Sequence, residues 1–202
     1  MIKPSTKTRI VSEGHALLQR FGFNGFSFQH IADRLGMKKP SLYDHFESKE
    51  ALGNELIDRY REVFIAWAER ASGESPSERL EKLFAMFSRF CREQHKMCPV
   101  TALSADMNTL PKSMRKNLES MAECYESWME TVIREGIRRG EFATKADPKA
   151  LATVVLSIAL GSQHLARMRH KPELFEEIVL GQVLQLLGAK KPRAKASKVT
   201  KR

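Results

Sequence analysis

The sequence predicts an all-α protein, and three observations lead to this prediction. Apolar residues recur at spacings of three and four along most of the chain, which is the period of an amphipathic helix. No segment shows the sustained alternation of period two that a half-buried strand produces. Proline directly follows a capping residue at Ser75-Pro76 and at Asp147-Pro148, and this pairing marks the start of a helix.

Amphipathic helices are expected from the N-terminus to residue 187. The first has one apolar face, formed by Ile10, Gly14, Leu17, Leu18 and Phe21. Three longer helices follow from the apolar positions Leu52, Leu56, Tyr60, Val63 and Trp67, then Leu80, Leu83, Phe84, Phe87, Phe90 and Cys91, then Met114, Leu118, Met121, Tyr125, Trp128, Val132 and Ile133. Residues 150–167 and 173–187 are also predicted to be helical. Cys98-Pro99 should interrupt the helices around it, because proline disfavours the αR conformation in the preceding residue.

Residues 27–46 predict two short helices joined by a tight turn. Ser27 can cap the first helix, and Gly36 can end it in the left-handed conformation. Pro40 lies in the first turn of the second helix, where Leu42 and Phe46, at i and i+4, face inward. The side chains left outside are those of Lys38, Lys39, Ser41, Tyr43, Asp44 and His45. This is a helix-turn-helix, whose second helix can enter the major groove of DNA.

Length and composition are those of a soluble globular protein. The 202 residues are 42% hydrophobic and 29% charged, enough to bury a sizeable core. Residues 1–20 lack the apolar segment of a secretory signal, and the uncharged run 151–161 is too short to span a bilayer. The odd set of three cysteines, Cys91, Cys98 and Cys124, does not suggest a disulfide scaffold. We therefore expect a cytoplasmic protein with no membrane partner.

Positive charge is concentrated at the two ends of the chain. The formal net charge is +10, yet residues 51–188 hold 19 basic and 19 acidic residues. Residues 1–50 carry +3, and the tail 189–202 holds seven basic residues and no acidic one. Basic ends on a neutral body suggest a polyanionic partner, most often nucleic acid. The tail itself is expected to be disordered, with weak phosphate attraction as an extra.

The first quarter of the chain resembles the tetracycline-repressor (TetR) family of one-component regulators. The matching residues are Ile31-Ala32, Gly36, the run 42–46 (Leu-Tyr-Asp-His-Phe), the run 48–52 (Ser-Lys-Glu-Ala-Leu) and the turn 21–23 (Phe-Gly-Phe). The resemblance covers roughly residues 5–55 and is specific, because many positions match in register. It implies a helix-turn-helix DNA-binding domain at 1–48, a helical ligand-binding and dimerisation domain at 49–188, and the basic tail 189–202.

The resemblance also implies which side chains touch DNA. Ser27 and Gln29 would approach the backbone and a base, while Lys38, Lys39, Pro40, Ser41 and Tyr43 would face the major groove. Tyr43 and His45 would contact phosphates or thymine methyl groups, and Lys49, at the start of the fourth helix, would contact a phosphate. Family members often have a capping serine where this chain has Lys38, and the missing cap costs roughly 1 kcal/mol. Lys38 would instead contact a phosphate or a guanine.

Two other interpretations of this segment are weaker. A helix-turn-helix can simply pack as a helix hairpin, but the match in register argues against that. His30 and His45 have no acidic or cysteine companion at ligand spacing, so no metal site is predicted.

The neutral half is expected to form a homodimer. Its last two helices are apolar on more than one face, through Leu151, Val154, Val155, Ile158 and Leu160, then Phe175, Ile178, Val179, Val183, Leu184, Leu186 and Leu187. A monomer would expose part of that surface. The resemblance implies a four-helix dimer bundle, which would place two recognition helices about one turn (~34 Å) apart on a near-palindromic double-stranded DNA operator.

The middle helices contain many adaptable apolar side chains, which favours a cavity for an unknown small-molecule effector. The candidate ligand-binding residues are Phe64, Trp67, Phe87, Met97, Cys98, Met107, Met121, Tyr125, Trp128 and His164. The alternative is a plain hydrophobic core, and for any single residue this alternative has the greater weight.

Cys98 suggests a further alternative within the same family. The segment 96–107 resembles that of a TetR subgroup, some of whose members sense electrophiles or oxidants through a cysteine, although Met97 replaces the usual glycine. Lys96, His95 and the helix start after Pro99 would favour its thiolate. The simpler interpretation is a small buried residue where a loop packs on the core.

Three classes of function were compared. A ligand-responsive repressor, released from DNA by a small molecule, explains most of the pattern. An enzyme is not predicted, because the sequence has no Gly-x-Ser-x-Gly elbow, His-Glu-x-x-His motif, P-loop or Rossmann glycines, and neither catalytic residues nor a cofactor are expected. A DNA-binding protein without a ligand remains open, and a cavity of a few hundred Å3 would argue against it.

Overall fold

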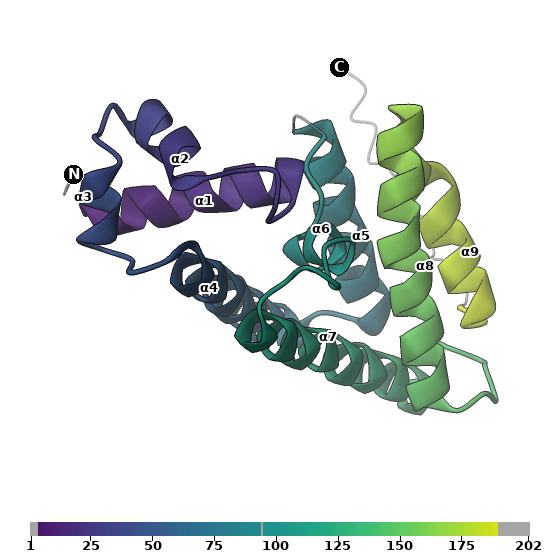
Figure 1. The fold of residues 1–202 in the computed structure, drawn as a ribbon. Helices are drawn as coiled ribbons and strands as arrows, with labels where there is room; N and C mark the ends of the chain where they lie inside the picture. The colour runs from purple at the N-terminus through teal and green to yellow at the C-terminus, as the bar shows by residue number, and fades with distance from the viewer. Residues whose placement is uncertain (1–3, 94, 190–202) are drawn as a thin grey trace, which may run out of the picture.

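The computed structural model describes residues 4–93 and 95–189 of the chain. Apart from an isolated bridge between Phe142 and Ala189, these residues contain helices, turns and loops only, which confirms the all-α prediction. Figure 1 shows the elements, which are α1 Thr6–Phe21, α2 Phe28–Leu35, α3 Pro40–Tyr43, α4 Lys49–Arg70, the 3-10 turn η1 Ala71–Gly73, α5 Pro76–Arg92, α6 Pro99–Ser104, α7 Lys112–Arg138, α8 Pro148–Arg169, the π-helical η2 Phe175–Val179 and α9 Leu180–Leu186.

The predicted helix starts are formed by side-chain caps. The Ser75 hydroxyl accepts a hydrogen bond from the Glu78 amide (3.2 Å), and the Glu78 carboxylate accepts one from the Ser75 amide (3.0 Å). The Asp147 carboxylate likewise accepts from the Ala150 amide at the start of α8 (3.0 Å). These bonds satisfy amide groups that have no partner within the helix itself. They explain why the Ser-Pro and Asp-Pro pairs predicted α5 and α8 correctly.

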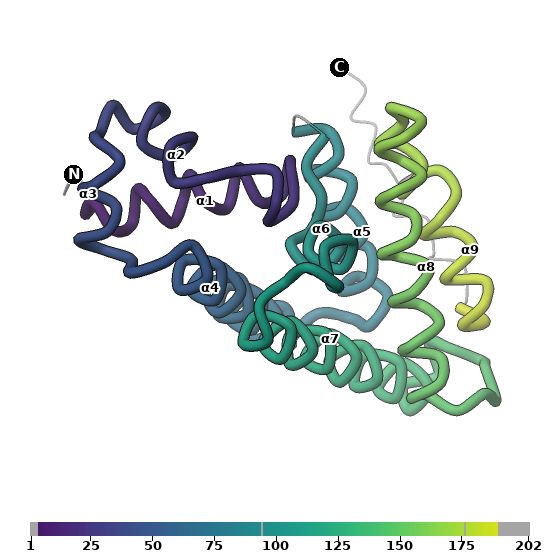
Figure 2. The backbone as a smooth tube through the Cα atoms, viewed as in Figure 1, coloured from purple at the N-terminus to yellow at the C-terminus, as the bar shows by residue number. Residues whose placement is uncertain are grey.

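The helices form a small N-terminal unit joined to a larger body. In Figures 1 and 2, α1, α2 and α3 lie at one end, and α4 runs from them toward α7. The helix α7 packs against α4 and α8, and α5 packs against α7, α8 and η2. A single hydrophobic core runs through both parts, from Ile10 and Leu42 in the N-terminal unit to Val155 and Val183 at the far end.

Some side chains predicted for the core lie at the surface. Phe21 is 46% exposed and Val63 is 50% exposed, while Phe64 takes the buried position on α4. The helical period predicted the buried faces of α5 and α7 correctly and failed at these two positions on α1 and α4. The pair Asn24-Gly25 is typical of a β-hairpin turn, yet here it connects α1 to α2.

Helix α8 has an apolar outer face as well as a buried one. By length and composition alone it is apolar enough to cross a membrane. Within the structure, 39% of its most apolar 18-residue stretch is buried. It packs against α5, α7 and η2 as part of the helical body, with Val154, Leu165 and Met168 exposed on its outer side. The predicted excess of apolar surface on the last helices is thus present.

Candidate nucleic-acid interface and its connection to the body

The turn between α2 and α3 has the geometry of a helix-turn-helix. Gly36 adopts the left-handed conformation (φ 64°, ψ 34°), and the Met37 amide donates to the Ala32 carbonyl across the turn (2.9 Å). At the start of α2 the Ser27 amide donates to Nδ1 of His30 (3.2 Å). His30 therefore works as the reciprocal partner of a helix cap, and the described residues contain no cluster suited to a metal ion.

Helix α3 is anchored by apolar side chains and presents polar ones to solvent. Leu42 is fully buried and Phe46 is 6% exposed. The Tyr43 ring packs edge-on against buried Phe28, with ring centroids 5.1 Å apart, yet 52% of Tyr43 remains exposed. The contact fixes the direction of the Tyr43 ring while its hydroxyl stays available, so the side chain is preorganised at low entropic cost.

The predicted DNA-contact residues other than Lys49 are exposed or partly buried. Exposed side chains come from Gln29, Lys38, Lys39, Pro40, Tyr43 and His45, with Ser27 and Ser41 partly buried. Within the described ranges, neither lysine has a carboxylate within ion-pair distance, so both ammonium groups are free to meet phosphates. The N-cap of α3 is Lys39, and not Lys38 as the resemblance implied, and the Lys39 side chain makes no capping hydrogen bond.

Lys49 has a different setting from the one expected. Its ammonium donates to the Phe23 carbonyl (2.6 Å) and lies over the rings of Phe23 and Phe26, 4.3 and 4.8 Å from their centroids. Burial lowers the pKa of Lys49, and nearby Asp106 opposes that shift. In this arrangement Lys49 ties α4 to the loop between α1 and α2, and its ammonium is engaged within the protein.

The end of α1 and the turn after it are held by the helical body. The Asp106 carboxylate, after α6, accepts from the amides of Phe23 (2.7 Å) and Asn24 (3.3 Å), and the Asn24 side chain donates to the Thr109 hydroxyl (2.6 Å). Gly22 has a positive φ of 74°, and a Cβ there would lie 2.7 Å from the Asp106 carboxylate. We use the name interdomain clamp for these hydrogen-bonded groups, which are the side chains of Asp106, Asn24 and Thr109 and the amides of Phe23 and Asn24. Sequence reasoning assigned Asp106 no role, and the structure shows that Gly22 leaves room for its carboxylate.

Most of the candidate ligand-binding residues form one aromatic and sulfur-rich cluster in the body. Phe64 packs against Trp67, Tyr125 and Trp128, with ring centroids between 4.4 and 5.7 Å apart. Phe87 also contacts Tyr125, at 6.5 Å. Met97, Cys98 and Met121 are buried in the same continuous core.

Two candidate residues lie away from this cluster. His164 is exposed and lines a groove at the end of α8, and Met107 lines a charged groove near the start of α7. Helical periodicity shows which face a residue occupies but not which neighbour that face meets, so the sequence alone could not separate them from the others.

A chain of polar groups crosses the apolar cluster. The Tyr60 and Tyr125 hydroxyls are 2.6 Å apart, and the Cys98 Sγ is 3.9 Å from the Tyr125 hydroxyl. Burial raises the pKa of both tyrosines well above the usual value, so both hydroxyls stay protonated. The Cys98 amide donates to Oε1 of Gln163 (2.7 Å). The Gln163 Nε2 and the Thr101 hydroxyl are buried with no hydrogen-bond partner in the described structure.

Comparison with known proteins places the chain in a family. Residues 10–56 match the model described as bacterial regulatory proteins, tetR family, and residues 76–180 match the tetracyclin repressor-like C-terminal domain. The HTH-type transcriptional repressor DhaR of Mycobacterium sp. (strain GP1) is 25% identical over 161 residues, which are 78% of this chain and 80% of DhaR.

Solved structures show the same fold. A TetR transcriptional regulator from Legionella pneumophila has a TM-score of 0.84 and 28% identity, covering 93% of this chain and all of that one. The reduced form of E. coli NemR has a TM-score of 0.76 and 22% identity, again covering 93% of this chain and all of that one. Because this is a family of DNA-binding regulators, the prediction that the chain is not an enzyme is confirmed. With a helix-turn-helix unit followed by the matching helical domain, the chain belongs to the TetR family of transcriptional regulators.

Proposed function

We propose that this regulator is a ligand-responsive repressor, which binds a near-palindromic operator as a homodimer in the cytoplasm and is released by a small molecule. The observation that carries the DNA-binding part is the exposed face of α3, with unpaired Lys38 and Lys39 beside the anchored Tyr43. Cations attract phosphates without regard to sequence, while side chains at the groove discriminate between bases. The relative DhaR is itself called a repressor.

The proposed contacts are those of the face described above. Lys38, Lys39, Pro40, Ser41 and Tyr43 would enter the major groove, with Ser27, Gln29 and His45 at its edges. Lys49 would act indirectly, by fixing α4 to the α1–α2 turn, since its ammonium already has a protein partner. This assignment changes the role of Lys49 from a phosphate contact to a positioning one.

A mobility-shift assay on the DNA flanking the gene tests this proposal. Specific binding should persist against competitor DNA and fall steeply as salt rises. Lys39→Ala and Tyr43→Ala should each weaken it roughly tenfold or more, because each contact is worth about 1–3 kcal/mol. Lys145→Ala, an exposed lysine in the loop before α8, is the matched control and should leave affinity unchanged. Unaltered binding in both α3 variants would refute the assigned face.

The effector is proposed to bind at the aromatic cluster and its polar chain. Gln163 and Thr101 provide buried donors that lack a partner, and such groups carry a free-energy cost unless a ligand or water satisfies them. The site thus favours an apolar molecule with a hydrogen-bond acceptor, seated among Phe64, Phe87 and Met121. A thermal-shift screen of neutral carbonyl compounds should find stabilisers whose effect is lost in Gln163→Met; a hit unaffected by that variant would place the site elsewhere.

A thiol sensor is the second candidate function. The Tyr125 hydroxyl lies 3.9 Å from the Cys98 Sγ and can donate toward a thiolate, while the Tyr60 hydroxyl donates to Tyr125. Burial raises the pKa of Cys91 to about 11 and also raises that of Cys124, which leaves these two thiols less reactive. In this mechanism N-ethylmaleimide alkylates Cys98 and releases the wild-type protein from DNA. If Cys98→Ser responds to the reagent as the wild type does, the thiol mechanism is wrong.

A further inference from the structure

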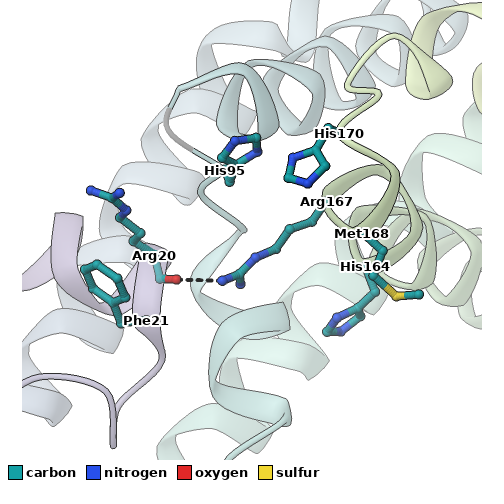
Figure 3. Close-up of a pocket in the computed structure, with 7 residues that line it drawn as sticks. All are labelled: Arg20, Phe21, His95, His164, Arg167, Met168 and His170. Atoms are coloured by element: carbon teal, nitrogen blue, oxygen red, sulfur yellow. Dashed lines mark hydrogen bonds between the residues drawn. The ribbon is translucent and has the colours of Figure 1, made fainter.

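A groove of about 500 Å3 opens where the end of α1 meets the end of α8. Figure 3 shows the side chains that line it, which come from three separate parts of the chain. Arg20 and Phe21 end α1, His95 lies between α5 and α6, and the end of α8 supplies His164, Arg167, Met168 and His170. The aromatic cluster proposed for the effector contributes none of them.

The groove combines a positive lining with apolar surface. Two arginines and three histidines line it, and no acidic residue does. Throughout 4–93 and 95–189, no carboxylate forms an ion pair with Arg20 or Arg167. Phe21 is 46% exposed and Met168 is 73% exposed. Phe21 and Met168 offer apolar surface and the two arginines offer charge-assisted hydrogen bonds, which together suit a molecule that has an apolar body and a negative end.

Helix ends explain part of this positive charge but not all of it. Both α1 and α8 point their C-termini at the groove, and the carbonyl groups there attract cations. Arg167 donates one hydrogen bond to such a carbonyl, that of Arg20 at the end of α1 (2.9 Å). A guanidinium carries five N–H donors, so most of its capacity remains, and the Arg20 side chain only stacks on its neighbour Phe21, 4.9 Å from the ring centroid.

The backbone holds two of the histidines in an uncommon conformation. His95 and His170 have positive φ angles of 58° and 53°, which few residues other than glycine adopt. Their rings meet edge to face, with centroids 4.8 Å apart, and so join the loop after α5 to the end of α8. At His170 this conformation is the left-handed cap that ends α8, while His95 adopts it in the loop after α5.

We propose that this groove binds a small organic anion, with its carboxylate on Arg167, Arg20 and the histidines and a flat apolar body on Phe21 and Met168. This second ligand site is separate from the effector site proposed above. It also spans the two parts of the molecule: Arg167 reaches the Arg20 carbonyl, and the Met97 amide donates to the Gln19 carbonyl (2.9 Å). An anion on Arg167 therefore acts on the contact that positions α1, which links its binding to the placement of the helix-turn-helix.

Isothermal titration with benzoate tests the proposal, in a buffer free of phosphate and carboxylates. Benzyl alcohol is the neutral probe of similar shape and should bind far more weakly. Arg167→Met should weaken benzoate roughly tenfold or more, the effect of losing a charge-assisted hydrogen bond. Arg169→Met removes an exposed arginine two residues further along the same helix, outside the groove lining, and should not change the affinity.

Two further variants keep the test decisive if Arg167→Met destabilises the protein. Arg20→Met and His164→Leu alter side chains that make no hydrogen bond within the described structure, and each should weaken benzoate several-fold. Wild-type protein that does not bind benzoate, equal binding of benzoate and benzyl alcohol, or full affinity in all three groove variants would each overturn the anion site. These binding measurements need no operator, so their outcome is independent of the repressor proposal.

Discussion

His15 lies on α1 against Tyr60, with ring centroids 6.5 Å apart. Burial lowers its pKa to about 4, and the charge of nearby Arg59 contributes to the shift. The unfolded chain takes up a proton at His15 near pH 6.5, whereas the folded protein does so only near pH 4. The contribution of His15 to stability is therefore complete above pH 6.5 and is lost as the pH falls from 6.5 to 4.

His15→Gln should make stability less dependent on pH. Each pH unit within that window costs the wild type up to about 1.4 kcal/mol through this one group, and glutamine has no proton to take up. Urea unfolding at intervals between pH 7.5 and pH 4.5 measures the effect as the difference between variant and wild type. As the pH falls, the free energy of unfolding of the wild type should decrease more steeply than that of the variant. If the two free energies change in parallel with pH, His15 titrates normally in the folded state.

At the scale of elements, the interdomain clamp joins the N-terminal unit to the body. The Asp106 carboxylate accepts two backbone hydrogen bonds from the turn between α1 and α2, and Lys49 fixes the start of α4 to the same turn. Hydrogen bonds to a charged group contribute about 1.5–3 kcal/mol, more than neutral ones. The turn is thus held on both sides by elements that continue into the helical domain.

Asp106→Ala should lower the free energy of unfolding by about 2 kcal/mol, because the Phe23 and Asn24 amides lose a charged acceptor. Asp106→Asn keeps an acceptor oxygen without the charge and should lose less. Chemical denaturation measures both, with Asp44→Ala, at an exposed position on the helix-turn-helix, as the control. A loss in Asp106→Ala no larger than in the control would mean that the clamp contributes little to stability.

Local signals in the sequence predicted elements well and contacts between elements poorly. The caps at Ser75 and Asp147 and the left-handed Gly36 each act within a few residues, so the printed sequence contains the whole interaction. The bond from the Phe23 amide to Asp106 joins positions 83 residues apart, and no local pattern encodes it. The same limit explains why Lys49 was assigned to a phosphate, and why the groove at Phe21 was predicted as buried core.

At the scale of the whole molecule, the outer face of α8 is the strongest argument for a dimer. Val154, Ile158, Gly161 and Leu165 recur at spacings of four and three, so they form one stripe along the helix, and this stripe ends one turn before Met168 in the groove. Val154 and Leu165 are 45% and 49% exposed, and a Cβ added at Gly161 would meet nothing. Ile178 and Leu186, in the segment after α8, are also exposed. A stripe with a small residue at its centre suits close packing of a second helix, as in a four-helix bundle.

Leu165→Glu should therefore convert the proposed dimer to a monomer, because a carboxylate buried at the contact loses its hydration without gaining a partner. Val63→Glu is the matched control: Val63 is 50% exposed on α4, outside the stripe, and this variant should stay dimeric. Sedimentation equilibrium measures both masses. Operator affinity should fall with the dimer, since one helix-turn-helix engages only one half-site and loses the gain from binding two at once. A wild type that sediments as a monomer, or a Leu165→Glu variant that stays dimeric, would show that this face of α8 is not the interface.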